Sequence, residues 1–451
     1  MRHFMLSRSG VIALAFLLAL PSAILAQDNK MSYGSPAYWR PYGQTGINVF
    51  ETTKADDSLQ YTGMKVRIGA GFTQQFQNLK QKNKGALGND SYNKLYPLAS
   101  GFMTAQANLF VDVQLADGIR LNVTTYLSTR HHNEAWVKGG YIQFDKLPFK
   151  AKFWQDLMKI TTIKVGHMEI NYGDAHFRRS DGGQTLYNPF MESYIMDGYA
   201  TEIGGEVYLQ KDGLFGMVGV TNGMIKGNVD SVAKTEVDDN VKRQPSIYFK
   251  GGIDKNISDN IRVRFSGSFY HNSSSAASGL TLFGGDRSGS NYQNVMEKAP
   301  AGVSLPKSTD IAFSGRLNPG FTKKVDAIML NGFLKMAGLE LFGTYETAKG
   351  RSKTETSNRR MNQYAGDIVY RFGSRENLFA GLRYNLVKGQ LAGIANDVKV
   401  DRVAGAAGWF VTRNILLKGE YVIQKYRSFP SSDYRSGGKF NGYVIEAVVG
   451  F

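Results

Sequence analysis

Apolar and polar residues alternate one by one along KFNGYVIEAVVGF, the last segment of the chain. One face carries Tyr443, Ile445, Ala447, Val449 and Phe451, and the other carries Gly442, Val444, Glu446, Val448 and Gly450. Because successive side chains of a strand point to opposite faces, this pattern predicts a β-strand with one continuous apolar face and a charge on the other.

The same alternation recurs along the chain in segments of about ten residues, each pair of which is joined by a short polar turn. The turns lie at Ala116 to Gly118, Gln210 to Gly213, Lys255 to Asn260, Lys335 to Gly338, Gly373 to Asn377 and Thr412 to Asn414, with a longer linker LPFKAKFWQDLMK. Long polar stretches separate these hairpins, at 78–97, 173–198, 229–245, 271–310, 348–361, 390–400 and 427–438. Short turns at one end and long loops at the other are typical of a bacterial transmembrane barrel, with periplasmic turns and extracellular loops.

Counting the alternating segments predicts an all-β fold, a transmembrane antiparallel β-barrel of about 16 strands that starts near Met64 and ends at Phe451. In IRLNVTTYL, Ile119 and Leu121 lie on the outward row and Arg120 on the inward row. An Arg or Lys that faces lipid at the midplane costs roughly 2 to 4 kcal/mol, so the charged rows face the lumen. The basic residues assigned to these rows are Lys65, Arg67, Arg120, Lys250, Arg262, Arg264, Arg371, Arg383 and Lys418. The acidic ones are Asp112, Glu169, Glu202, Glu206, Glu340, Glu346, Asp367, Glu420 and Glu446, so the two signs are balanced.

The start of the chain has the layout of a secretory signal peptide. Arg2 and Arg8 precede the apolar run Gly10 to Leu20, which is too short to span a bilayer, and small residues lead to Ala26. We expect a signal peptide at 1–26, a periplasmic extension at 27–63 and the barrel at 64–451. Export followed by a barrel predicts the cell outer membrane.

Composition agrees with a barrel and excludes several classes of protein. The chain has 51 Gly, 24 Tyr and 27 Phe, and no Cys, which excludes thiol catalysis and disulfides. The net charge of +16 comes without a basic helix or a recognised nucleic-acid module, so we expect no nucleic acid. Neither a G-x-S-x-G elbow nor an H-E-x-x-H motif occurs, so we expect no enzyme, no metal and no cofactor.

The segment from Thr161 to Gln210 is the richest in polar detail. Its first strand puts Val165, His167, Glu169 and Asn171 on the lumen row, opposite Met168, Ile170 and Tyr172. A loop at about 173–198 follows with Asp174, His176, Arg178, Arg179, Asp181 and Glu192, and the returning strand directs Glu202 and Glu206 inward. Our hypothesis is that Arg178 and Arg179 face acidic partners across a narrowing of the pore. The alternative is that both are solvated charges of a hairpin outside.

This segment resembles the phosphate-selective porin O and P family and its general-porin relatives. The resemblance rests on I-K-V-G-x-x-E (Ile163 to Glu169), R-R-S-D (Arg178 to Asp181), N-P-F-M-E (Asn188 to Glu192) and E-x-G-G-E (Glu202 to Glu206). It implies sixteen strands, a homotrimer, and a loop after the fifth strand that folds inward to narrow the pore. It also implies passive diffusion of small hydrophilic solutes or anions, although the balanced charges of the lumen argue against phosphate specificity.

Two further expectations concern partners and an alternative function. The C-terminal Phe451, after alternating apolar residues, resembles the signal that the barrel assembly machinery recognises, and outer-membrane lipid and lipopolysaccharide are the expected surroundings. The alternative function is a barrel with a closed lumen that serves as an adhesin, assembly partner or surface scaffold. The two functions differ in whether the loop at 173–198 narrows the pore or plugs it.

Overall fold

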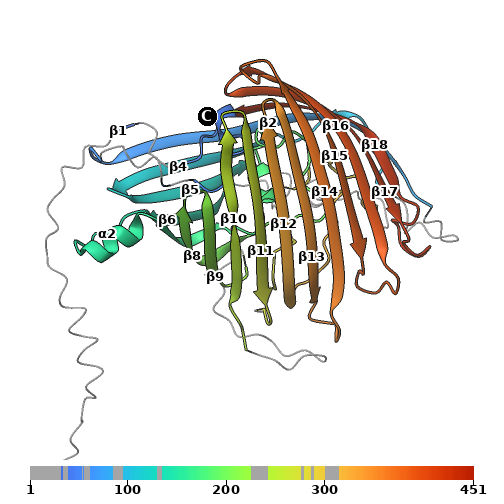
Figure 1. Ribbon diagram of the computed structural model, residues 1–451. Coiled ribbons are helices and arrows are strands. Elements are labelled where there is room, and N and C mark those ends of the chain that lie inside the picture. The colour runs from blue at the N-terminus through green and yellow to red at the C-terminus, as the bar shows by residue number, and fades with distance from the viewer. Residues whose placement is uncertain are drawn as a thin grey trace, which may run out of the picture.

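The chain forms one sheet that closes on itself into a barrel (Figure 1). The computed structural model describes residues 32–33, 39–52, 54, 61–84, 95–128, 135–224, 242–275, 279–285, 289–299 and 314–451. The barrel closes because β18 (Lys439–Gly450) pairs antiparallel with β2 (Lys65–Lys82). No helix in this part of the chain is long and apolar enough to cross a membrane.

Sixteen antiparallel strands build the barrel, as the sequence predicts. Besides β2 and β18 they are β4 (Gln106–Ala116), β5 (Ile119–Ser128), β6 (Trp136–Phe144), β7 (Thr161–Glu169), β8 (Thr201–Lys211), β9 (Leu214–Thr221), β10 (Ser246–Ser258), β11 (Ile261–Asn272), β12 (Lys324–Met336), β13 (Leu339–Arg351), β14 (Arg359–Phe372), β15 (Leu378–Gly389), β16 (Val398–Thr412) and β17 (Ile415–Arg427). Two short strands, β1 (Ser32–Tyr33) and β3 (Gly101–Phe102), pair with β2 at its edges. One helix, α2 (Lys152–Met158), and two 3-10 turns, Gln44–Gly46 and Ala175–Arg178, complete the described elements.

The predicted short turns join the strands at one end of the barrel. Between β8 and β9 the turn residues Asp212 and Gly213 both have positive φ, of 52° and 80°. Such a pair of residues gives a two-residue turn the twist of its flanking strands, which is why Asp-Gly marks tight hairpins. The longer linker between β6 and β7 carries α2 instead.

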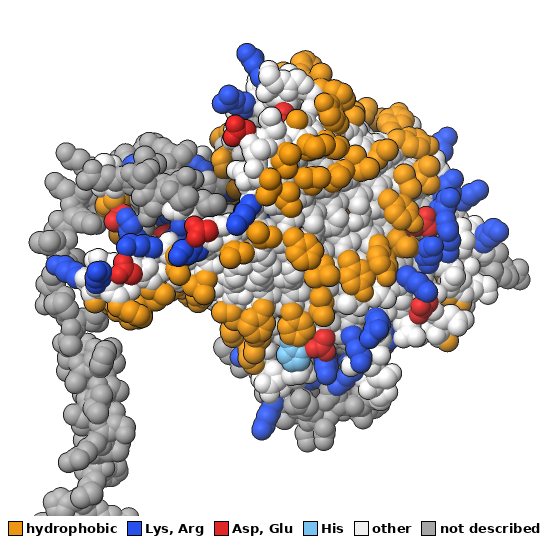
Figure 2. Space-filling model, in the orientation of Figure 1, with side chains coloured by type: hydrophobic (Ala, Val, Ile, Leu, Met, Phe, Trp, Pro, Cys, Tyr) orange, Lys and Arg blue, Asp and Glu red, His pale blue; other side chains and the backbone are white. Residues whose placement is uncertain are grey.

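The two faces of the strands differ as the alternation predicts. On β11, Val263 and Phe265 are exposed on the outer surface while Arg264 and Ser266 are buried inside. Figure 2 shows hydrophobic side chains over the outer surface of the barrel and charged side chains mostly toward its ends. An apolar outer band and a polar interior are the arrangement that a lipid-embedded barrel requires.

The predicted facing of β7 is wrong at its start. Val165 is 51% exposed on the outer surface, whereas Met168 is buried. Val165 lies in an unbroken register, opposite Ile142 of β6 and Gly205 of β8, and the pairing of β6 with β7 runs from Gly140 with His167 to Phe144 with Ile163. Ile142 is also exposed on the outer surface, so the row of Val165 faces outward here, opposite to the prediction.

Three segments of the chain fill much of the barrel interior. We call them the N-terminal segment (39–52), the inward loop (170–200) and the outer loop (279–285, 289–299 and 314–323). Apolar side chains of the inward and outer loops are buried in one cluster with side chains of the wall, among them Phe190, Met191, Ile195, Leu282 and Val295. Phe50 of the N-terminal segment is buried in a second cluster. Asn48 and Phe50 of the N-terminal segment are buried. Residues 39–52 of the predicted periplasmic extension (27–63) therefore lie inside the barrel and not in the periplasm.

Candidate functional site: the barrel interior

The inward loop begins after the fifth barrel strand, β7, and is held against the opposite wall by buried cations. Lys418 of β17 donates from Nζ to the backbone carbonyl oxygens of Thr185 (3.0 Å), Asn188 (2.9 Å) and Phe190 (3.1 Å). The same Nζ lies 2.9 Å from a carboxylate oxygen of Glu446. Hydrogen bonds to an ionised donor are the stronger kind, so this lysine fixes the course of the loop.

Two arginines extend this attachment along the neighbouring strands. Arg383 of β15 donates to the carbonyl oxygen of Glu192 at 2.8 Å and pairs with Asp367. Arg402 of β16 donates to the carbonyl oxygen of Ser193 at 2.7 Å. Both side chains are buried, so the middle of the inward loop lies against β15 and β16 rather than free in the lumen.

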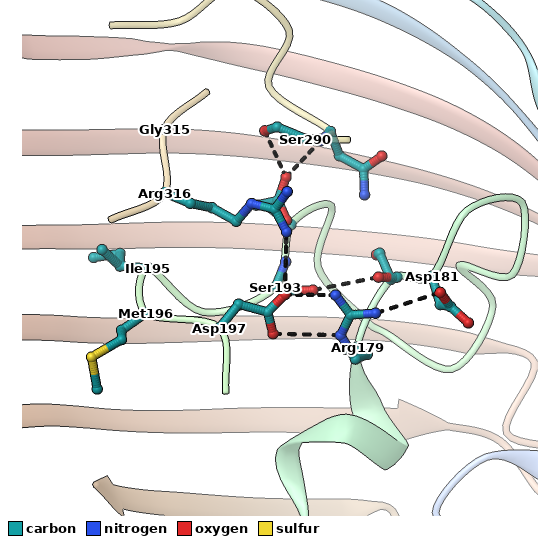
Figure 3. Close-up of polar contacts among 12 residues, drawn as sticks. Arg179, Asp181, Ser193, Ile195, Met196, Asp197, Ser290, Gly315 and Arg316 are labelled. Carbon is teal, nitrogen blue, oxygen red and sulfur yellow. Dashed lines mark hydrogen bonds and ion pairs between the residues drawn. The ribbon is translucent and has the colours of Figure 1, made fainter. Parts of the chain in front are cut away.

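The first part of the inward loop is held by an acidic and basic network (Figure 3). Arg179 lies between Asp181 and Asp197, with its Nη2 2.6 Å from Oδ2 of Asp197. Arg316 of the outer loop also contacts Asp197, at 3.2 Å. Asp181 in turn pairs with Lys138 of β6. The network therefore links the inward loop, the outer loop and the wall.

The N-terminal segment joins the inward loop at a buried cluster of four charges. Glu51 lies 2.8 Å from Lys250 and 2.6 Å from Arg264, and both cations also contact Asp174, at 2.7 and 2.8 Å. Nearby, Arg178 donates to Asn48 and lies 3.6 Å from Glu340. Each charge in the cluster faces two of the opposite sign, so the burial of all four is electrostatically compensated.

Burial alone would raise the pKa of the Glu51 carboxyl, yet the charges of Lys250 and Arg264 outweigh it and lower that pKa to about 2. For Asp174, burial likewise acts upward, and the same two cations lower the pKa below its ordinary value. A carboxyl whose pKa is lower in the folded state stabilises that state above its unfolded pKa and loses the contribution as the pH falls toward the folded value.

We therefore expect the stability difference between the protein and Glu51→Gln to hold from pH 8 to about 5 and to shrink below about pH 4, since the unfolded carboxyl titrates there. The measurement is the midpoint of thermal unfolding in detergent over this pH range. Asp156→Asn, on the exposed surface of α2, is the control and leaves the midpoint close to that of the parent. A difference that grows as the pH falls would contradict the ion-pair account.

A cavity of about 270 Å³ remains between the β4–β8 wall and the two segments folded against it. Its lining includes Lys138 and Gln143, which lie near the two ends of β6, so the cavity follows the height of this wall. Charges of both signs line it: Arg67, Asp112, Lys138, Lys164, Glu169 and Asp181. Arg67 pairs with Asp112 at 2.5 Å, and Lys164 lies over the rings of Tyr141 and Tyr208. The cavity is thus a polar space with aromatic walls.

The structure divides the predicted site residues into two groups. His167, Glu169, Asn171, His176, Arg179 and Asp181 line the cavity. Asp174, Arg178, Glu192, Glu202 and Glu206 are buried away from it and hold segments together, as when Glu202 accepts from Tyr270 at 2.8 Å. Both arginines of the R-R pair are buried, so the interpretation as solvated charges outside is wrong.

The predicted basic residues of the lumen mostly meet carboxylates. The pairs are Arg67 with Asp112, Arg120 with Asp145, Arg262 with Asp254, Arg264 with Asp174, Arg371 with Glu340, Arg383 with Asp367 and Lys418 with Glu446. Lys65 lies at the start of β2, partly buried. Because the cations are paired, the interior is no continuous basic ladder. No group of three or more His, Asp or Glu in the described residues is arranged to hold a metal ion.

Sequence reasoning missed several residues of the interior. Trp39, Arg40 and Glu51 line the cavity although they precede the barrel strands. The aromatic residues Trp39 and Tyr42 were the available signal, since they stand out in an otherwise irregular stretch. Tyr42 stacks on Phe110 of β4, and its hydroxyl donates a hydrogen bond to the carboxylate of Asp112 on the same strand at 2.8 Å.

Comparison with solved structures shows which known folds this barrel resembles. An anion-selective porin from Comamonas acidovorans matches 86% of this chain and 100% of its own, with a TM-score of 0.51 and 9% identity. The fold is that of the outer-membrane porins. The outer membrane channel DcaP of Acinetobacter baumannii (87% and 99% covered, TM-score 0.48, 10% identity) and OmpF of Salmonella typhi (86% and 97%, 0.47, 11%) are further matches.

Two comparisons of the amino-acid sequence, with protein-family models and with curated proteins, found no match. The likeness to the porin fold is therefore a likeness of architecture, and the resemblance to the phosphate-selective O and P family extends no further than this general fold.

Proposed function

We propose that the protein is an outer-membrane porin that lets small hydrophilic solutes or ions diffuse along the β4–β8 wall. The single observation that carries this is the polar cavity between that wall and the inward loop, because it follows the height of β6. Passive diffusion needs a wet route and no cofactor or catalytic group, and the chemistry of the lining fits this requirement.

Single-channel conductance in a planar bilayer tests the proposal. Since the inward loop, the outer loop and the N-terminal segment occupy much of the lumen, we expect stable steps of small conductance for a sixteen-stranded barrel. Correctly folded protein that gives no steps under any applied voltage would overturn the open-path function.

Selectivity depends on the charges along the cavity. Lys164 lines it between two tyrosine rings, and replacing Lys164 by Glu changes the local charge by two units. We expect Lys164→Glu to shift the reversal potential in a salt gradient toward cations, because a charged ring at a narrow point selects the opposite charge.

The matched control for this prediction is Lys425→Glu, an exposed position near the loop end of β17. It makes the same change of charge outside the cavity, and we expect a much smaller shift of the reversal potential. Equal shifts for the two variants would show that the cavity is not the ion path.

A closed-lumen scaffold is the second candidate, and the buried apolar cluster inside the barrel favours it. The cluster includes residues of the inward loop and outer loop, and a dry core resists the passage of ions. Folded protein that is silent in the bilayer but exposes its loops on the cell surface would support this function over the first.

The cellular setting that we propose follows from the sequence features. A signal peptide at 1–26 would direct export, and the C-terminal residues would present the chain to the barrel assembly machinery. The backbone of Phe451 pairs with Ala70 of β2 at 2.9 and 3.1 Å, so the C-terminus completes the seam of the barrel. Lipid and lipopolysaccharide surround such a barrel, and we propose a homotrimer without enzymatic activity.

A further inference from the structure

The connection between β6 and β7 differs from the other connections at its end of the barrel. The turns around Asp212 and Asn414 are tight, whereas residues 145–160 extend outward and form α2. Figure 1 shows α2 projecting from the rim of the barrel beside β5 and β6. The extension adds a small surface outside the wall that lines the cavity.

The projecting segment exposes three aromatic side chains. Phe149 is 49% exposed, Phe153 67% and Trp154 38%, and Trp154 packs its ring 5.7 Å from Phe149 and 5.1 Å from Phe153. Within α2 only Met158 is buried. A cluster of exposed aromatic rings is unfavourable in water and marks a surface that meets an apolar or interfacial partner.

The charges beside these rings are mainly positive. Lys150 and Lys152 are exposed and have no carboxylate partner among the described residues, while Lys159 pairs with Asp156 at 2.6 Å. The rings and the free lysines therefore form a short amphipathic surface, which we call the aromatic arm (149–159). Aromatic rings with adjacent lysines suit the level of phospholipid head groups.

The aromatic arm continues the apolar outer surface of the barrel. Ile160, directly after it, accepts a hydrogen bond from the backbone of Gln210 at 2.8 Å. On the same strand end, Leu209 and, across the turn, Leu214 are exposed on the outer face. In Figure 2 hydrophobic side chains lie along the lower edge of the projecting arm and charged ones above them, toward its outer side. This edge faces the same way as the apolar side chains of the wall.

We infer that the aromatic arm lies on the periplasmic leaflet of the outer membrane, with Phe149, Phe153 and Trp154 among the head groups and Lys150 and Lys152 against the phosphates of anionic phospholipid. The inference rests on the proposed function, which puts the barrel in that membrane. The arm holds the β6–β7 wall, and with it the cavity, at a fixed depth. Lys54 links the arm to the interior, since its Nζ donates to the carbonyl oxygens of Asp145 (2.9 Å) and Met158 (2.6 Å).

Fluorescence quenching in vesicles tests this contact. The full chain is reconstituted into phosphatidylethanolamine with phosphatidylglycerol, using acyl chains brominated at shallow or deep carbons, and is compared with Trp154→Phe. The difference between the two spectra reports Trp154, and we expect it to be quenched by the shallow bromines more than twofold better than by iodide in water. Lys150→Glu/Lys152→Glu is expected to weaken the shallow quenching, and the loss should vanish in vesicles without the anionic lipid.

Trp409, exposed on the outer face of β16, reports whether the barrel itself is inserted. If Trp409 is quenched by the brominated lipid while Trp154 is open to iodide, the arm does not touch the membrane and the inference is overturned. Shielding of Trp154 from both quenchers that disappears on dilution of the protein would assign the arm to a second copy and also overturn it. If Trp409 is not quenched in folded protein, the membrane location fails as well.

Discussion

Replacing residues 182–192 by a short Gly-Ser linker is expected to raise the single-channel conductance several-fold. This stretch places Phe190 and Met191 in the interior. Its carbonyl oxygens accept hydrogen bonds from the wall: Glu192 from Arg383 and Phe190 from Lys418. Its removal leaves the wall intact, because the hydrogen bonds between strands do not involve the loop, and opens the packed part of the lumen to water.

The control for the loop replacement is a Gly-Ser replacement in the exposed connection between β15 and β16, at residues 395–397, where Asp397 pairs with Lys388 on the surface. We expect the control to conduct as the parent does. A loop replacement that folds, as judged by its heat-dependent migration in gels, and conducts no better than the parent would show that the inward loop does not limit the path.

Arg264→Met is expected to cost about 3 to 5 kcal/mol of the free energy of unfolding, since removing one member of a buried ion pair leaves its partners uncompensated. Arg264 is buried and contacts Glu51, Asp174 and Asp254, so three carboxylates lose a cation at once. The measurement is urea-dependent unfolding in lipid vesicles, followed by tryptophan fluorescence.

Arg262→Met, two residues away on the same face of β11, is the matched control. Arg262 is partly exposed and pairs with Asp254 alone, so its loss should cost about 1 kcal/mol or less. The fourfold change Glu51→Gln, Asp174→Asn, Lys250→Met and Arg264→Met should recover part of the stability, because all four charges of the cluster are then removed together. Equal costs for Arg264→Met and Arg262→Met would contradict the role of the four-charge cluster.

Strands and turns could be predicted from the sequence because both signals are local. The alternation in Lys439 to Phe451 and the Asp-Gly pair at Asp212 depend on neighbours along the chain, and the barrel follows once such segments repeat. The inward position of Arg120 and Arg264 could also be predicted, since a charge facing lipid is costly whatever the tertiary structure.

The interior could not be predicted in the same way. Glu51 forms ion pairs with Lys250 and Arg264, which lie about two hundred residues later in the chain, and no sequence pattern near Glu51 predicts these partners. The facing of Val165 was wrong because this apolar residue shares its row with His167 and Glu169, so the pattern alone does not decide which row of β7 faces outward. That the loop at 173–198 packs against β15 and β17, instead of only narrowing the lumen, depends on side-chain fit across the barrel.

The short register between β6 and β7 has a mechanical consequence. These strands share backbone hydrogen bonds only from Gly140 and His167 to Phe144 and Ile163, whereas β12 and β13 pair from Lys324 and Arg351 to Met336 and Leu339. A closed cylinder under tension parts where the fewest bonds resist. The hoop of this barrel therefore has one built-in line of rupture, and amide protons along it should exchange with deuterium before those of the β12–β13 side.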